Sequence, residues 1–252
     1  MPHERHLVVF SGAGLSADSG IATFRGADGL WENHSIDEVC NYNTWERNSE
    51  SVHRFYNARR VKLAEVQPNP MHRLLANWQT RVRTTLITQN IDDLLERAGA
   101  TNVLHVHGFL TEMRCLTCEA AWDIGTTTWD PSKDRCPSCN SGDRVKPNVV
   151  FFNEPAPLYE PMANVFASLG RDDVLVVIGT DGVVVPIGRI AEQLPCRKVL
   201  NNLVPVAPDD FVPGMVHPKQ FDRTIFKPAA EAAGELDEIV TSWMAAWSGS
   251  GL

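Results

Sequence analysis

Residues 7–20 read LVVFSGAGLSADSG, an apolar run that passes directly into small and polar residues. The run Leu7–Phe10 predicts a buried strand, because consecutive apolar residues bounded by turn formers suit a sheet that is covered on both faces. The Gly12-Ala13-Gly14 step predicts a tight loop that opens a helix, where backbone N–H groups can approach a pyrophosphate without side-chain obstruction. Taken alone, a Gly/Ala run of this length fits an ordinary tight turn equally well.

Later segments repeat the short apolar pattern and extend it to a sheet. We predict further strands at residues 83–88, 103–106, 174–178 and 198–200. Strands that alternate with helical segments favour an α/β fold with a parallel sheet covered on both faces.

Two stretches interrupt this alternation and are interpreted as insertions that form a smaller domain. Residues 31–76 are polar and aromatic, with helical periodicity around 51–66. Residues 109–146 are rich in the turn-forming residues Gly, Asp, Ser and Pro, as is typical of a zinc ribbon. The sheet domain then comprises the remaining segments, 1–30, 77–108 and 147–252.

Four of the six cysteines form two Cys-x2-Cys pairs separated by 17 residues: Cys115, Cys118, Cys136 and Cys139. This spacing is typical of a structural zinc site in which four thiolates surround the metal. Four reduced cysteines without metal would leave a segment too poor in apolar residues to fold by burial. Because four thiolates leave no open coordination position, we expect this zinc to hold structure and not to catalyse.

Composition and charge narrow the range of functions. Apolar residues make up 43% of the chain and charged residues 21%, which is ordinary for a globular protein. The net charge of −8 argues against direct nucleic-acid binding, which needs clustered Lys and Arg, and favours basic protein partners. No stretch resembles a signal peptide or approaches the roughly 20 apolar residues of a membrane span. We therefore expect a cytoplasmic protein without a membrane partner.

Polar motifs follow the predicted strands at their carboxyl ends, where open α/β sheets place ligands. Gln89-Asn90-Ile91-Asp92 follows one strand, His107-Gly108 another and Gly179-Thr180 a third, while Thr23-Phe24-Arg25 follows the first loop. In this order, and with the two cysteine pairs, the motifs resemble the sirtuin family over nearly the whole chain.

The resemblance implies a Rossmann-like domain with helical and zinc insertions, NAD as co-substrate in the cleft between them, one structural zinc ion, and an acyl-lysine protein or peptide as substrate. The residues that it assigns to NAD are Gly12, Ala13, Gly14, Ser16, Thr23, Phe24, Arg25, Trp31, Gln89, Asn90, Ile91, Asp92, His107, Gly179, Thr180, Asp181, Asn202 and Ala229.

Catalytic roles also follow from the resemblance. It implies that His107 is the general base, which suits an imidazole near neutral pH. Asn90 and Asp92 would orient the nicotinamide amide and a water, and Arg25 would help close the site. His105 lies within the predicted strand and is expected to be structural, whereas His107 lies beyond the strand end, where the cleft should open.

The segment Phe55-Tyr56-Asn57-Ala58-Arg59-Arg60 bears on the acyl group. Tyr56 and Arg59 are three residues apart, so on a helix they share a face. The segment resembles the corresponding one in sirtuins that remove succinyl and malonyl groups, in which a phenol and a guanidinium hold the acyl carboxylate. The other interpretation is a solvated basic helix face with a core tyrosine.

Peptide binding by strand addition is implied for residues 149–154 and 182–186. Within them, Val149, Phe151, Phe152 and Val183 are the predicted contacts. Both segments also fit plain edges of the fold.

The chain departs from the family pattern at three positions, with Asp181 in place of Ser, Val204 in place of an acidic residue and Asn153 in place of Gly. Asn is the residue other than Gly that best tolerates a left-handed backbone. We expect NAD to bind with altered affinity.

The sequence thus predicts an NAD-dependent protein-lysine deacylase that removes acetyl and also succinyl or malonyl groups, giving nicotinamide, O-acyl-ADP-ribose and free lysine. Two alternatives remain open: mono-ADP-ribosyl transfer, and an NAD-sensing or binding module without catalysis.

Overall fold

A six-stranded parallel sheet lies at the centre of the computed structural model, which describes residues 5–23, 30–31, 34–205 and 214–245. Its strands are β1 (Leu7–Ser11), β4 (Thr84–Thr88), β5 (Leu104–His105), β9 (Val174–Ile178), β10 (Arg197–Asn202) and β11 (Arg223–Phe226). They lie in the order β11-β10-β9-β1-β4-β5. Every residue of β1 and of β9 is buried, which explains why both strands are continuous apolar runs in the sequence.

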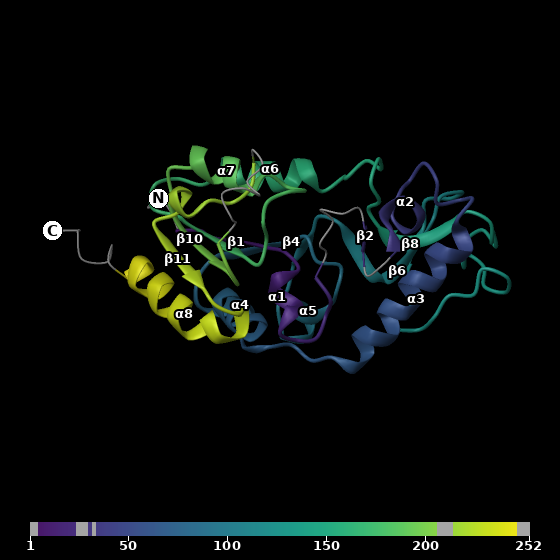
Figure 1. Cartoon of the computed structure of the whole chain (residues 1–252), viewed down its shortest axis with the longest axis horizontal. Helices are drawn as coiled ribbons and strands as arrows, with labels where there is room; N and C mark the ends of the chain where they lie inside the picture. The colour runs from purple at the N-terminus through teal and green to yellow at the C-terminus, as the bar shows by residue number, and fades with distance from the viewer. Residues whose placement is uncertain (1–4, 24–29, 32–33, 206–213, 246–252) are drawn as a thin grey trace.

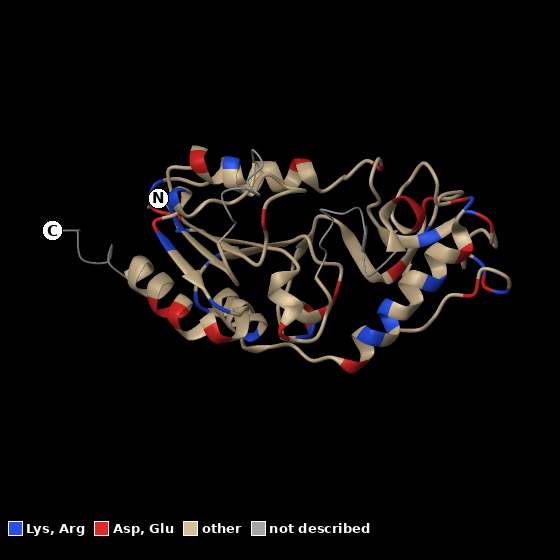
Figure 2. Cartoon of the chain, viewed as in Figure 1, with Lys and Arg blue, Asp and Glu red and all other residues tan. Residues whose placement is uncertain are grey.

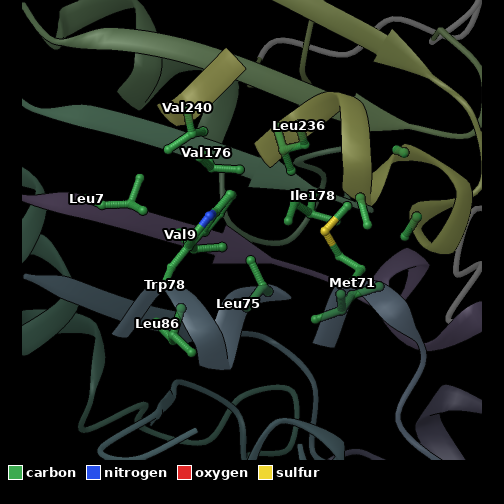
Figure 3. Packing of buried hydrophobic residues seen from close by; sticks show 14 of the residues in the cluster. Leu7, Val9, Met71, Leu75, Trp78, Leu86, Val176, Ile178, Leu236 and Val240 are labelled. Atoms are coloured by element: carbon green, nitrogen blue, oxygen red, sulfur yellow. The ribbon is translucent and has the colours of Figure 1, made fainter. Parts of the chain in front are cut away.

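Helices cover both faces of this sheet (Figure 1). On one face lie α1 (Gly14–Ala17), α4 (Pro70–Arg81), α5 (Leu94–Arg97) and α8 (Ala229–Ala245); on the other lie α6 (Tyr159–Ala167) and α7 (Ile187–Gln193), followed by a 3-10 turn, η3 (Pro218–Gln220). Figure 3 shows Leu75 and Trp78 of α4 and Leu236 of α8 packed against Val9 and Val176 of the sheet. The parallel α/β architecture predicted from the sequence is confirmed.

Helix α4 starts where the Pro68-Asn69-Pro70 sequence places it. The Asn69 side chain accepts hydrogen bonds from the first turn, and Pro70 occupies the first helical position, where its missing N–H costs nothing. The expected domain boundary between residues 76 and 77 falls inside α4. Because Met71 and Trp78 both lie in the core of the large sheet, the whole helix packs with the sheet domain.

The smaller domain lies at the other end of the molecule (Figure 1). Its helical part contains β2 (Leu30–Trp31), β3 (His34–Ser35), α2 (Ile36–Val39) and α3 (Ser49–Glu65), and its zinc-ribbon part is an antiparallel sheet of β7 (Ala121–Asp123), β6 (Gly108–Cys115) and β8 (Val145–Val149) in the order β7-β6-β8. Both parts share one core, in which Tyr56 and Leu63 of α3 meet Leu110 and Phe151.

Strand β6 begins at the residue after His107, and its Gly108 pairs with Val149 of β8. The chain therefore passes from β5, the edge strand of the parallel sheet, through the predicted base His107 directly into the ribbon sheet. Among the described residues, no helix has the length and apolar character that crossing a membrane requires.

Candidate active site

A cleft of about 2220 Å³ lies between the two domains at the carboxyl ends of the parallel strands. Because a single small-molecule site usually takes roughly 300–1,000 Å³, the cleft has room for two occupants. The residues predicted for NAD that line it are Gly12, Ala13, Gly14, Ser16, Thr23, Gln89, Asn90, Ile91, Asp92, His107, Gly179, Thr180, Asp181, Asn202 and Ala229. The predicted contacts Phe24 and Arg25, and the side chain of Trp31, lie outside the described residues.

The floor of the cleft is formed where the loops after β1 and β9 touch. The Gly14 amide donates to the Gly179 carbonyl at 2.9 Å, and a Cβ on Gly14 would lie 2.6 Å from the Gly179 Cα atom. Gly179 also has a φ of +63°, which an L side chain rarely adopts. The absence of side chains at these two positions lets the two loops pack together. A side chain at either glycine would collide with the backbone of the opposite loop.

Ser16 lies at the centre of a buried hydrogen-bond network in the wall of the cleft. Its hydroxyl lies 2.9 Å from Asp92 Oδ2, 3.1 Å from Asn90 Nδ2 and 3.3 Å from His72 Nε2. The Asn69 amide donates to His72 Nδ1 at 3.2 Å, so the ring proton must lie on Nε2 and point at Ser16. Ser16 then accepts from two donors, and its own proton points at Asp92.

Burial sets the protonation of the two titratable members of this network. It lowers the pKa of His72 to about 4, which keeps the ring neutral near pH 7. It raises the pKa of Asp92, while the bonds from the Ser16 hydroxyl and the Leu94 amide act in the opposite direction. The two residues predicted to orient the reactants, Asn90 and Asp92, are thus held to one another through Ser16.

His107 is placed as an acceptor of protons. Its Nδ1 lies 3.2 Å from the Gln89 carbonyl oxygen, which can only accept, so Nδ1 carries the ring proton. Its Nε2 lies 2.9 Å from the Tyr159 hydroxyl and accepts from it. Burial lowers the pKa of His107, so the ring is neutral near pH 7 with Nε2 as its basic nitrogen.

His105 lies apart from the cleft, as its position within the predicted strand indicated. One ring nitrogen bonds the Asn90 carbonyl at 2.9 Å and the other the Glu96 carboxylate at 2.9 Å. With both nitrogens engaged in the fold, His105 has a structural role.

Asn202 reaches the cleft with both ends of its amide engaged. Its Oδ1 accepts from the Thr180 amide, and its Nδ2 donates to the Thr180 carbonyl, both at 3.0 Å. The side chain therefore fixes the loop after β9. Asp181, the departure from the family pattern, is exposed in that loop and lines the cleft, so its carboxylate faces whatever binds there.

The predicted acyl pair is divided between core and cleft. Arg59 lines the cleft, with its guanidinium 3.2 Å from the centre of the Phe55 ring. Tyr56 is fully buried and stacks on Phe151 at 5.8 Å, and its hydroxyl donates to Cys40 Sγ at 3.5 Å. Of the pair only Arg59 lines the cleft, whereas the tyrosine ring lies in the core, as the second interpretation had it.

Both segments predicted for the peptide contribute to the lining of the cleft, with residues 149–154 from one and 182–184 from the other. Phe152 is 40% exposed and Val183 68%, whereas Val149 and Phe151 are buried. Asn153 has a φ of +64°, the left-handed conformation that its replacement of a glycine implied.

The four paired cysteines come together at the tip of the ribbon sheet. Cys115 and Cys139 Sγ atoms are 3.6 Å apart, those of Cys118 and Cys136 are 3.7 Å apart, and all four lie within 4.8 Å of one another. A tetrahedral zinc at about 2.3 Å from each thiolate separates the sulfurs by roughly 3.8 Å. The cluster therefore fits a closed structural zinc site.

Several residues of the site carried no signal in the sequence. Each of three such residues forms a hydrogen bond with a predicted one: His72 with Ser16, Tyr159 with His107, and Cys40 with Tyr56. No motif in the sequence connects the members of these pairs. A buried ion pair joins Lys146 Nζ to Oε2 of Glu154, the last residue of the 149–154 segment, at 3.1 Å and was likewise not predicted.

Comparison with known sequences identifies one family. The Sir2 family model matches residues 12–186, more than half of the chain. An NAD-dependent protein deacylase of Helicobacter hepaticus is 43% identical over 254 residues, covering 92% of this chain and 96% of that relative. An NAD-dependent protein deacylase of Campylobacter jejuni is 44% identical over 202 residues, covering 79% of this chain and 83% of the relative.

Solved structures of the same family share the fold. A crystal structure of a Sir2 homolog–NAD complex matches with a TM-score of 0.78 and 33% identity, covering 96% of this chain and 92% of that one. A Sir2–p53 peptide–NAD+ complex matches with a TM-score of 0.73 and 26% identity, covering 95% of both chains.

Proposed function

The chain belongs to the Sir2 (sirtuin) family, and we propose that it is an NAD-dependent protein-lysine deacylase that uses NAD as co-substrate and carries one structural zinc ion. The observation that carries the proposal is the position of His107, whose basic Nε2 faces a cleft large enough for a dinucleotide and a peptide segment together. Relatives named as deacylases, and family members solved with NAD and with a peptide, support this choice.

The polar lining of the cleft suits a dinucleotide. Amide, hydroxyl and carboxylate groups line it, from Gln89, Asn90, Thr180 and Asp181. Groups of these kinds can form hydrogen bonds with ribose hydroxyls and with the nicotinamide amide. When bound, NAD would supply a sugar carbon that becomes electrophilic as nicotinamide leaves, and the acyl-lysine oxygen is the group that captures it.

The chain's own residues bind, orient and accept a proton. The Gln89 carbonyl keeps the proton of His107 on Nδ1, which leaves Nε2 to deprotonate a ribose hydroxyl. Ser16 ties Asn90 to Asp92, so both are held in one arrangement before the substrate arrives. Preorganisation of this kind lowers the barrier because no group has to be oriented at the moment of reaction.

We further infer that the deacylase accepts negatively charged acyl groups, succinyl and malonyl, as well as acetyl. Arg59 supports this, because it lines the cleft and a planar guanidinium can bind one carboxylate through two hydrogen bonds. Tyr56 is the second member of the predicted pair, and contact with the acyl carboxylate would require its buried hydroxyl to leave Cys40, which itself lines the cleft. An acetyl group needs neither contact.

A panel of acetyl-, malonyl- and succinyl-lysine peptides tests the proposal with wild type and Arg59→Met. We expect the variant to lose succinyl turnover by about tenfold or more, since a charge-assisted hydrogen bond contributes about 1.5–3 kcal/mol, and to keep acetyl turnover. Full succinyl turnover in Arg59→Met would contradict the acyl assignment alone.

Labelled NAD tests the reaction type in the same mixtures. Label in O-acyl-ADP-ribose is the expected result. Label on protein would indicate ADP-ribosyl transfer instead, and NAD binding without turnover of any peptide would indicate a module that does not catalyse.

A further inference from the structure

The basic nitrogen of His107 already has a partner in this structure. The Tyr159 hydroxyl lies 2.9 Å from His107 Nε2, and the two ring centres are 6.0 Å apart. Both side chains line the cleft. The contact is therefore made inside the site, at the atom to which the proposed mechanism assigns the proton.

The direction of this hydrogen bond follows from the other side of the imidazole. Since Nδ1 donates to the Gln89 carbonyl, Nε2 of the neutral ring has only a lone pair to offer. The phenol must be the donor, and burial raises the pKa of Tyr159, which keeps it protonated. A neutral imidazole nitrogen has one lone pair, so Nε2 cannot accept from Tyr159 and from a substrate hydroxyl at once.

Tyr159 is held firmly where it makes this contact. It is the first residue of α6, and its amide donates to the Ala156 carbonyl at 3.1 Å. One and two turns further, Met162 and Phe166 of α6 are buried against the sheet, with the Phe166 ring 5.9 Å from that of Phe10. The helix thus presents the phenol from the face of the sheet opposite to α4 and α8.

We propose that Tyr159 is a positioning residue for His107: its hydroxyl holds the imidazole with Nε2 directed into the cleft, and a substrate hydroxyl displaces it when it takes over the lone pair. The identification of that hydroxyl as one of the NAD ribose rests on the proposed function. Binding at the base is then an exchange of one O–H donor for another, in which the ring is never without a partner.

This exchange predicts a gain of affinity when the phenol is removed. In Tyr159→Phe the aromatic ring remains, and ADP-ribose, which carries the ribose hydroxyls, no longer has to displace a donor. We expect calorimetry to show ADP-ribose binding tighter by roughly three- to tenfold, the value of one neutral hydrogen bond. Equal or weaker affinity in Tyr159→Phe would overturn the exchange.

The ring itself gives a second measurement that does not depend on turnover. A donor bonded to the lone pair stabilises neutral His107, so Tyr159→Phe should raise the pKa of His107 in the NMR titration of the free protein. Tyr159 on α6 and the Gln89 carbonyl after β4 are the polar partners that the described residues place on this ring. The His107→Phe variant, which lacks the resonance, assigns it. An unchanged His107 pKa in Tyr159→Phe would sink the proposal.

Tyr42→Phe is the matched control, because it removes a phenol from another tyrosine, which is partly buried and packs against the core of the smaller domain. It should leave the His107 pKa unchanged. If the protein turns over acyl peptides, the acid limb of kcat/KM should move to higher pH in Tyr159→Phe, since this limb reports the free enzyme's base. If wild type binds ADP-ribose but turns over no peptide, the proposed function fails while the exchange is still decided by the affinity and the pKa.

Discussion

The imidazole of His72 serves two parts of the protein through its two nitrogens. Nδ1 accepts from the Asn69 amide and completes the cap of α4, and Nε2 donates to Ser16 beside the cleft. An Asn side chain places its amide near the position of Nδ1, whereas a Gln side chain places its amide near that of Nε2. The two substitutions can therefore separate the cap from the network.

His72→Gln should retain the donor to Ser16 and hence most of the NAD affinity, and should lose about 1 kcal/mol of stability with the cap interaction. His72→Asn should retain the cap and weaken NAD binding several-fold. Thermal unfolding and NAD calorimetry on both variants check this. A similar loss of affinity in both would contradict the role assigned to the Nε2 donor, because only His72→Gln keeps a donor at that position.

Single residues were predictable from the sequence where a motif implied them. His107 and the four cysteines lie where the motifs indicated, and Asn153 has the backbone conformation that its type allows. The burial of Tyr56 was not predictable, because spacing on a helix fixes which residues share a side but not how deep that side lies. Tyr159 was invisible for a related reason, since its role depends on a contact with a residue 52 positions away.

At the scale of elements, the segment 149–154, which lines the cleft, folds around one buried ammonium group. Lys146 Nζ, on β8, donates to the Val149 carbonyl at 2.7 Å and to Glu154 at 3.1 Å, and lies 4.1 Å from the Phe151 ring centre. Glu154 in turn accepts from the Phe151 amide at 2.8 Å. Burial lowers the pKa of Lys146, while the charge of Glu154 and its hydrogen bond act in the opposite direction.

Lys146→Met should destabilise the protein by about 3–5 kcal/mol, because it leaves the Glu154 carboxylate buried without its countercharge. The double variant Lys146→Met/Glu154→Leu removes both charges and should recover most of that loss. It should nevertheless raise the KM for an acetyl peptide several-fold at unchanged NAD affinity, since the Val149 carbonyl and the Phe151 amide lose their partners. Urea unfolding and steady-state kinetics test this, and a double variant that is stable and has the wild-type KM would limit the pair to a structural role.

Elements were predictable where one strong pattern determined them. The central strands and α3 follow from continuous apolar runs and helical periodicity, and the ends of β9 coincide with the prediction. Edge strands were harder, since β11 buries only Ile225 and β5 has two residues. The ribbon strands were missed, and in β8 the reason is visible, because the buried Lys146 interrupts the apolar pattern of that strand.

At the scale of the whole molecule, each domain contains a buried histidine that acid must charge. Burial lowers the pKa to about 4 for His53, on α3 in the smaller domain, and to about 4 for His72, on α4 in the larger one. In the unfolded chain both titrate near 6.5. Between pH 6.5 and 4 the unfolded state binds more protons than the folded state, so the free energy of unfolding falls as pH falls. The stability that the two neutral histidines contribute is fully present above pH 6.5.

The free energy of unfolding in urea should therefore decrease by about 2–3 kcal/mol per histidine between pH 7 and 4.5. Asp92, whose pKa burial raises, acts in the opposite direction and reduces the total. The variant His53→Leu should show a shallower decrease than wild type. If its decrease is as steep as that of wild type, the acid sensitivity arises elsewhere.

The contact between Gly14 and Gly179 sets a limit for anyone who wishes to re-engineer this cleft for a different nucleotide. Mutagenesis libraries that randomise those two positions will consist largely of misfolded clones, because any added carbon collides with the opposing main chain. Diversity is better directed at Asp181 and at Leu203 and Val204, which border the same hollow and are open to solvent.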